Sequence, residues 1–176
     1  MTHADLVIAA ARWLSGSMRC GIVLTEFASG ARETPDAIGF RRGGSSVLVE
    51  CKVSRADFRA DGRKGHRRSA DGAGAARYYM TPPELVDISD LPAGWGLVWG
   101  GPRRNKVRVY AGVRILSPAS LREEAAILYS LGRRCLLGEC WRPKGVTPPL
   151  PGVPLPDRWA EGPEQGDLLR VRGEKP

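Results

Sequence analysis

One apolar run with strict two-residue alternation, residues 47–53, constrains the fold more than any other part of this chain. Side chains alternate between the two faces of a β-strand, so one face of this run is apolar and the other carries Leu48, Glu50 and Lys52. A second short run, residues 37–40, precedes it across a glycine-containing turn. Two such runs around a tight turn predict a β-hairpin with one face in a hydrophobic core.

The turn of this hairpin decides which side chains face each other. If the chain folds about Gly43, Asp36 lies directly opposite Glu50, with β-carbon atoms about 4.5 to 5.5 Å apart. A turn centred between Gly43 and Gly44 would place the two acids on opposite faces, and we predict the first arrangement. Two carboxylates that face each other destabilise a sheet unless a cation lies between them, and a divalent metal would supply that charge.

Asp36, Glu50 and Lys52 together are the minimum set for metal-assisted cleavage of a phosphodiester bond. A competing interpretation places the second strand at a sheet edge, where Glu50 and Lys52 form an ordinary solvated ion pair. About half an acid-x-lysine triplet is expected by chance in a chain of this composition, so the spacing alone does not choose between the two interpretations.

The order of the motifs resembles the PD-(D/E)XK nuclease superfamily. Three features carry the resemblance, in this order along the chain: Pro35-Asp36, then Glu50-Cys51-Lys52 on an apolar strand, then a helix that begins at Ser54. Segment 54–61 is also similar to small members of that superfamily from bacteria and phages. The resemblance covers roughly residues 1–115, and it implies a restriction-endonuclease-like αβββαβ core of the α/β class, with a mixed central sheet flanked by helices.

The resemblance also implies a role for each motif residue. Asp36, Glu50 and Lys52 would be catalytic, and Mg²⁺ or Mn²⁺ would be held by Asp36, Glu50 and the main-chain carbonyl of Cys51. Lys52 would orient the attacking water or stabilise developing charge. The implied activity is that of an endodeoxyribonuclease, a metal-dependent hydrolase of DNA, with RNA left open as a substrate. The competing function on the same fold is a non-catalytic module that binds nucleic acid or protein.

Two further acids are candidates for an oxygen-rich metal shell. Glu33 lies three residues before Asp36, and Glu26 ends the preceding apolar run. Carboxylate oxygens suit magnesium and manganese, so either acid could complete the shell. Solvation in a turn or at a sheet edge is the competing explanation for both residues.

Capping signals and apolar periodicity place the other elements. Helices are expected from Thr2 to Gly16, from Ser54 onward, and from Ser120 to about Arg134. Further strands are expected over residues 21–27, 77–81, 94–99 and 107–116. In the last helix, Leu121, Ala125 and Leu128 form an apolar stripe that is expected to pack on the sheet or on a partner subunit, which leaves a homodimer open.

The basic balance of the chain predicts an anionic partner. The formal net charge is +8 and the sequence pI is about 9.8. Arginines spaced four residues apart predict a phosphate-binding stripe along the second helix, continued by the residues that follow it: Arg55, Arg59, Arg63, Lys64, Arg67 and Arg68. The competing interpretation is a solvated helix face. A second basic group in a turn, Arg103, Arg104 and Lys106, is a weaker second candidate patch, for which solvation is the preferred explanation.

The remaining features set the outer bounds. Domain organisation is expected as a nuclease-like core over residues 1–116, a helix within residues 117–141 and a Pro-rich extended tail over residues 142–176. The chain has no apolar segment of the roughly 18 to 20 residues that a membrane span needs, and a secretory signal is not expected, which predicts a soluble cytoplasmic protein. Two histidines, His3 at a flexible start and His66 in a loop, do not support histidine-based catalysis.

Overall fold

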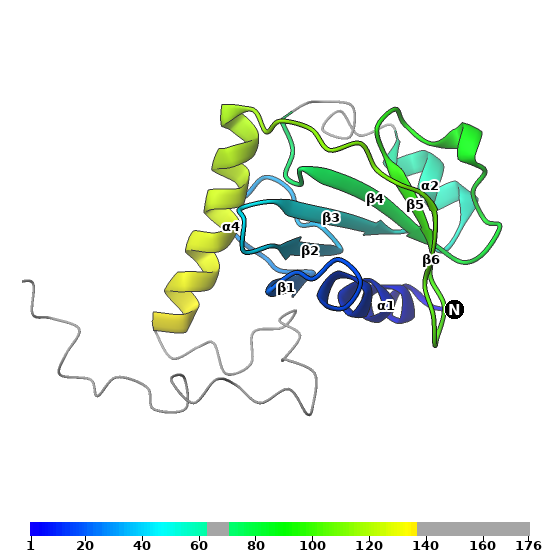
Figure 1. Cartoon of the computed structure of the whole chain (residues 1–176), viewed down its shortest axis with the longest axis horizontal. Helices are drawn as coiled ribbons and strands as arrows, with labels where there is room; N and C mark the ends of the chain where they lie inside the picture. The colour runs from blue at the N-terminus through cyan, green and yellow to red at the C-terminus, as the bar shows by residue number, and fades with distance from the viewer. Residues whose placement is uncertain (63–70, 137–176) are drawn as a thin grey trace, which may run out of the picture.

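The computed structural model describes residues 1–62 and 71–136, which form a mixed α/β fold (Figure 1). The helices are α1 (His3–Ser15), α2 (Arg55–Asp61) and α4 (Pro118–Leu136), with a short 3₁₀ helix η1 (Ile88–Asp90). The strands are β1 (Ile22–Thr25), β2 (Ala37–Phe40), β3 (Ser46–Cys51), β4 (Ala76–Thr81), β5 (Gly96–Trp99) and β6 (Lys106–Val109). The predicted α/β class is confirmed.

The six strands form one sheet in chain order from β1 to β6. Strand β2 is antiparallel to both β1 and β3, β4 runs parallel to β3, β5 runs parallel to β4, and β6 returns antiparallel to β5. Parallel neighbours need a crossover, and α2 lies in the connection from β3 to β4. A mixed sheet with helices packed against it is therefore the architecture of the described residues, and β3 lies in its interior.

The two faces of the sheet belong to two separate apolar clusters. Val47, Val49 and Cys51 pack with the buried face of α1. Leu48 points the other way, into a cluster that includes Phe58 of α2 and the buried face of α4. Strand β3 therefore shows the predicted two-residue alternation. Helices cover both faces of the sheet at this strand.

Local capping explains why α1 begins where the sequence predicts. The Thr2 side chain accepts a hydrogen bond from the Asp5 main-chain N–H, and Asp5 Oδ2 accepts one from the Thr2 N–H at 2.8 Å. This reciprocal capping box satisfies two helix-end donors that would otherwise lack partners. At the other end, Gly16 follows the last helical residue, as expected. The α2 helix likewise begins after Ser54, whose hydroxyl caps the Asp57 N–H at 3.1 Å.

The C-terminal elements differ from the prediction. The last strand is shorter than residues 107–116, because after β6 the chain crosses the starts of β4 and β5 with single contacts such as Arg114 N–H to the Ala75 carbonyl. Helix α4 begins at Pro118, two residues before the predicted cap, because Ser117 caps it by accepting from the Ser120 N–H at 3.1 Å. Proline suits the first helical position, where its missing N–H costs nothing.

The packing face of α4 also corrects the prediction. Leu121 and Leu128 of the predicted stripe are exposed, whereas Glu124 and Ile127 are buried against the core. Glu124 Oε1 accepts hydrogen bonds from the Ser46 hydroxyl at 2.6 Å and from the Gly74 N–H at 2.9 Å. Helix α4 therefore packs on the sheet through a polar anchor next to Ile127.

Only part of the predicted domain organisation falls within the described residues. Within the described part of the chain, all sheet strands lie between residues 22 and 109, and α4 ends at Leu136. The Pro-rich tail predicted for residues 142–176 lies outside the described residues. Across residues 1–62 and 71–136, no helix is both long and apolar enough to span a membrane.

Two glycines of the β2–β3 hairpin make a matched test of the packing. A β-carbon at Gly39 would approach the Cys20 side chain at 2.6 and 2.8 Å, whereas one at Gly43 would meet nothing within 4 Å. We expect Gly39→Ala to lower the free energy of unfolding by about 1 to 3 kcal/mol through overpacking. Gly43→Ala should change it by less than about 1 kcal/mol. Urea unfolding of both variants measures this difference, and equal midpoints would contradict the packing described here.

Candidate functional site

The β2–β3 hairpin brings the two predicted acids together. It pairs Ala37 with Val49, and one step further along this register Asp36 lies opposite Glu50. The register is the one predicted for a hairpin centred on Gly43. Asp36 Oδ2 accepts a hydrogen bond from the Cys51 main-chain N–H at 2.7 Å, which fixes the carboxylate at the end of β3.

Lys52 lies among three carboxylates. Its Nζ atom is 3.3 Å from Glu50 Oε2, 3.4 Å from Asp61 Oδ1 and 3.8 Å from Asp36 Oδ2. The side chains of Lys52 and Glu50 are only 7% and 3% exposed, and that of Asp36 is 19% exposed. The interpretation as a solvated pair at a sheet edge is therefore wrong, because β3 is an interior strand. We call Asp36, Glu50, Lys52 and Asp61 the carboxylate–lysine cluster.

Asp61 is a member of this cluster that the sequence analysis did not identify. It ends α2, its side chain is 1% exposed, and its Oδ2 atom accepts from the Tyr79 hydroxyl at 3.0 Å. Tyr79 in turn stacks on Trp95, with ring centroids 4.4 Å apart. The sequence did hold a signal, because Phe58 is the large apolar residue of α2 and a residue three positions later lies on the same helix face.

His3 is a second residue next to the cluster that the sequence did not indicate. Its Nε2 atom lies 3.6 Å from Asp36 Oδ1 and 3.4 Å from Glu26 Oε1. The expectation of a flexible start is wrong for this residue, because the Thr2 cap makes His3 the first residue of α1. The helix therefore presents an imidazole at the more exposed side of the cluster, where it can orient the Asp36 carboxylate.

The two further acids lie in different places. The Glu26 N–H donates to the Asp36 carbonyl at 3.1 Å, and Glu26 has a left-handed backbone with φ of 45°. This conformation is strained for a residue other than glycine, and such strain tends to gather at functional sites. Glu33 is instead buried, with its carboxylate beside Gly72 and Arg77. Of the two candidates, the structure brings Glu26 to Asp36.

The electrostatics of the cluster keep Lys52 charged. Burial alone would lower the pKa of its ammonium, but Glu50, Asp61 and Asp36 outweigh burial and raise this pKa above its ordinary value. Lys52 is therefore a cation at neutral pH, and its contribution to stability is lost only as the pH rises through this elevated value.

Burial raises the pKa of the Cys51 thiol, and Asp36 and Glu50 raise it further, so this thiol is protonated and is not a nucleophile.

The donor set of the cluster suits a hard divalent cation. Three carboxyl groups surround one ammonium, so acidic groups outnumber the cation in this cluster. Carboxylate oxygens such as those of Asp36 and Glu50 are the ligands that magnesium and manganese prefer. In residues 1–62 and 71–136, no three His, Cys, Asp or Glu side chains are grouped as metal ligands. A third donor would therefore come from the main chain, where the carbonyl of Cys51 is the predicted one.

The predicted phosphate-binding stripe is described only at its start. Arg59 is exposed on α2. Arg55 donates to the Leu85 carbonyl at 2.8 Å and to Asp87 Oδ2 at 2.7 Å, so its guanidinium ties α2 to the loop after β4. The other members of the stripe and the second histidine lie outside the described residues: Arg63, Lys64, His66, Arg67 and Arg68.

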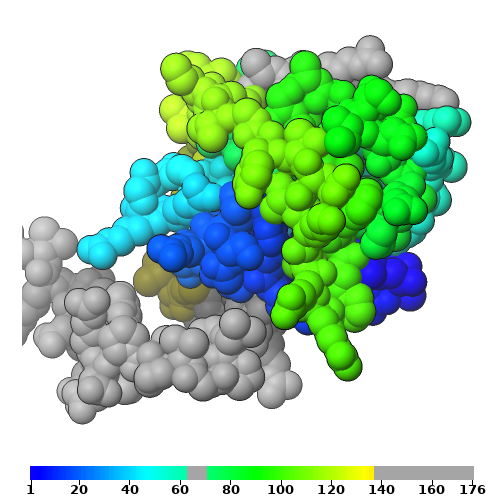
Figure 2. Space-filling view, turned by 45° about the vertical axis from the view of Figure 1, so that its right-hand side comes forward, coloured from blue at the N-terminus to red at the C-terminus, as the bar shows by residue number. Residues whose placement is uncertain are grey.

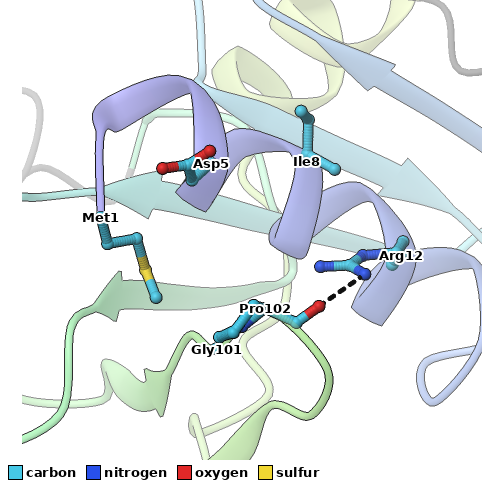
Figure 3. Close-up of a pocket in the computed structure, with 6 residues that line it drawn as sticks. All are labelled: Met1, Asp5, Ile8, Arg12, Gly101 and Pro102. Atoms are coloured by element: carbon cyan, nitrogen blue, oxygen red, sulfur yellow. Dashed lines mark hydrogen bonds between the residues drawn. The ribbon is translucent and has the colours of Figure 1, made fainter.

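A cavity of about 420 Å³ lies away from the cluster, between α1 and the turn that joins β5 to β6 (Figure 3). Met1, Ile8 and Pro102 give it an apolar lining. Arg12 crosses its edge and donates from Nη1 to the Pro102 carbonyl at 2.9 Å. No member of the carboxylate–lysine cluster lines this cavity.

Comparison with known proteins adds one structural neighbour. No protein-family model matches the chain, and no curated protein matches it. The fold is similar to that of a protein of unknown function from Silicibacter pomeroyi, with a TM-score of 0.61 and 23% sequence identity. The match covers 81% of this chain and 92% of that chain. At this identity the similarity shows a shared fold and carries no information about activity.

Burial of the cluster has a testable cost. Replacing Lys52 by Met leaves Glu50 and Asp61 buried beside a neutral group, so we expect the free energy of unfolding to fall by about 3 to 5 kcal/mol at neutral pH. The matched control is Arg55→Met, which removes one positive charge from the exposed pair with Asp87. That variant should lose about 1 kcal/mol or less. Urea unfolding measures both, and equal losses would show that Lys52 is not the cation that neutralises the cluster.

Proposed function

We propose that this protein is a metal-dependent nuclease of the PD-(D/E)XK type that hydrolyses phosphodiester bonds in DNA. The observation that carries the proposal is the carboxylate–lysine cluster, in which Asp36 and Glu50 face each other across a hairpin and share the Lys52 ammonium. The order helix, three strands, helix and strand over residues 3–81 supports a restriction-endonuclease-like core. The net charge of +8 is consistent with an anionic substrate.

Mg²⁺ or Mn²⁺ would be held by Asp36 and Glu50, with the main-chain carbonyl of Cys51 as a further ligand. When bound, the metal lowers the pKa of a coordinated water and neutralises charge on the scissile phosphate. The protein contributes the fixed position of these ligands. The Cys51 N–H holds Asp36 Oδ2 at 2.7 Å, and both ends of this contact belong to the hairpin.

Lys52 acts as a positive charge and not as a base. A general base must accept a proton, and the raised pKa of this ammonium leaves it protonated at neutral pH. A fixed cation beside the scissile phosphate stabilises the negative charge that develops in the transition state. Asp61 and the Tyr79 hydroxyl behind it hold the ammonium in place, so no reorganisation is needed at the moment of reaction.

His3 and Glu26 support the exposed side of the site. The imidazole lies between the two carboxylates, 3.6 Å from Asp36 and 3.4 Å from Glu26. A polar group next to a ligand carboxylate restricts its orientation, as partners of metal ligands commonly do. In this proposal His3 positions Asp36 and takes no part in proton transfer with the substrate.

The first functional prediction concerns cleavage. Asp36→Asn and Glu50→Gln keep the shape of each side chain but remove the ligand charge, so we expect Mg²⁺- or Mn²⁺-dependent cleavage of labelled DNA to fall by about 100-fold or more. Single-stranded, duplex and branched substrates are incubated with each metal and with EDTA. Asp87→Asn is the control, because Asp87 is an exposed acid outside the cluster. Wild-type cleavage by either cluster variant would remove that residue from the mechanism.

A second prediction concerns metal binding without substrate. Calorimetric titration with Mn²⁺ should give a binding isotherm for the wild type that Asp36→Asn abolishes and Asp87→Asn preserves. If the wild type binds DNA but neither takes up metal nor cleaves, the protein is a non-catalytic nucleic-acid-binding module. Its DNA affinity would then be the same with metal and with EDTA.

A further inference from the structure

A long stretch of the chain carries charge of one sign. Residues 91–122 contain six basic residues and no aspartate or glutamate. Four of the basic side chains are exposed on the β5–β6 hairpin, and we call them the hairpin patch: Arg103, Arg104, Lys106 and Arg108. With no acid in this stretch to pair with them, these side chains form a concentrated positive surface.

The hairpin contains a β-bulge that places one of these side chains. The pairing of β5 with β6 shifts by one residue between Leu97 and Val98, which leaves Arg108 as the inserted residue. A bulge turns the inserted side chain away from the regular alternation. The Arg108 guanidinium lies over the Trp99 ring, 4.2 Å from its centroid, in a cation–π contact.

The tip of the hairpin is anchored to α1. Asn105 Nδ2 donates to the Ala9 carbonyl at 2.9 Å, and its Oδ1 accepts from the Gly101 N–H at 3.2 Å. Arg12 donates to the Pro102 carbonyl, as Figure 3 shows, and brings a further guanidinium to the tip. Figure 2 shows the yellow-green segment that contains the hairpin as a ridge beside the blue α1. A ligand that binds this tip meets a surface whose main chain is already ordered, which lowers the entropic cost of binding.

Strand register relates the hairpin patch to the carboxylate–lysine cluster. Met80 pairs with Cys51, Thr81 pairs with Trp99, and Trp99 pairs with Lys106. The main-chain positions of Lys52 and Lys106 therefore lie in one row across the sheet, three strand spacings or about 14 Å apart. One extended chain of phosphates could pass from Lys106 to Lys52 along this row.

We propose that the hairpin patch binds the phosphate backbone of a nucleic acid strand, the next part of which reaches the carboxylate–lysine cluster. This inference rests on the proposed nuclease function for the second half of that statement. Guanidinium groups match phosphate oxygens in geometry and charge, and the absence of acids from residues 91–122 limits the repulsion of a polyanion. Binding is independent of base sequence and sensitive to salt, because each phosphate contact releases a counterion.

The test measures DNA binding without cleavage. The full chain carries Glu50→Gln in EDTA, and fluorescence anisotropy gives the Kd for labelled single-stranded and duplex DNA between 50 and 200 mM salt, conditions chosen for the counterion slope. The patch variant changes Arg103, Arg104 and Lys106 to Ala, and keeps Arg108 because it packs on Trp99. The control variant changes three exposed arginines elsewhere to Ala: Arg42, Arg122 and Arg133.

We expect the patch variant to raise Kd at least tenfold at low salt and to reduce the slope of log K against log salt by about 2 to 3. The control variant should change both quantities much less. Equal weakening by the two variants, or no weakening by the patch variant, would overturn the inference. Cleavage by the protein with native Glu50 is assayed separately. A protein that cleaves but binds through no patch rejects this inference alone, whereas patch-dependent binding without any cleavage rejects the nuclease function alone.

Discussion

The complete burial of β3 is the constraint on which the other features depend. All six of its residues are buried, because β2 and β4 flank it in the sheet and apolar clusters cover both of its faces. A charged side chain at the end of such a strand loses its hydration, and this loss is costly unless opposite charge lies next to it. Glu50 and Lys52 therefore act together with Asp36 and Asp61 as one electrostatic unit.

This unit is poorly explained by stability alone. Buried ion pairs often stabilise a fold no better than apolar residues of similar volume would. The polar contact at the other end of β3 has a plain structural purpose, because Glu124 there joins α4 to Ser46 and to the end of the loop before β4. The carboxylate–lysine cluster has three acidic groups around one cation and one partly exposed carboxylate, Asp36, which is the arrangement that a cation and a phosphate could use.

The parts that the sequence predicted well are those that neighbours in the chain decide. Caps at Thr2 and Ser54 mark the starts of two helices, and the β2–β3 turn sets the register that pairs Asp36 with Glu50. Prediction failed at α4, where Ser117 and Ser120 both offer a capping hydroxyl and Pro118 favours the first. The prediction of the buried face of α4 was also wrong, because contacts with the distant β3 and the loop before β4 select that face.

The sequence by itself determined the hairpin, its alternation and the pairing of two acids beside one lysine, since a period of two residues and a short turn are local properties. Only the tertiary structure decided that this pair is buried and that Asp61 and His3 join it. Those contacts come from the end of α2 and the start of α1, and a contact between segments far apart in the chain depends on how helices pack on the sheet. The contact of Arg108 with the Trp99 ring also depends on tertiary structure, because the bulge that positions Arg108 exists only when β5 and β6 are paired.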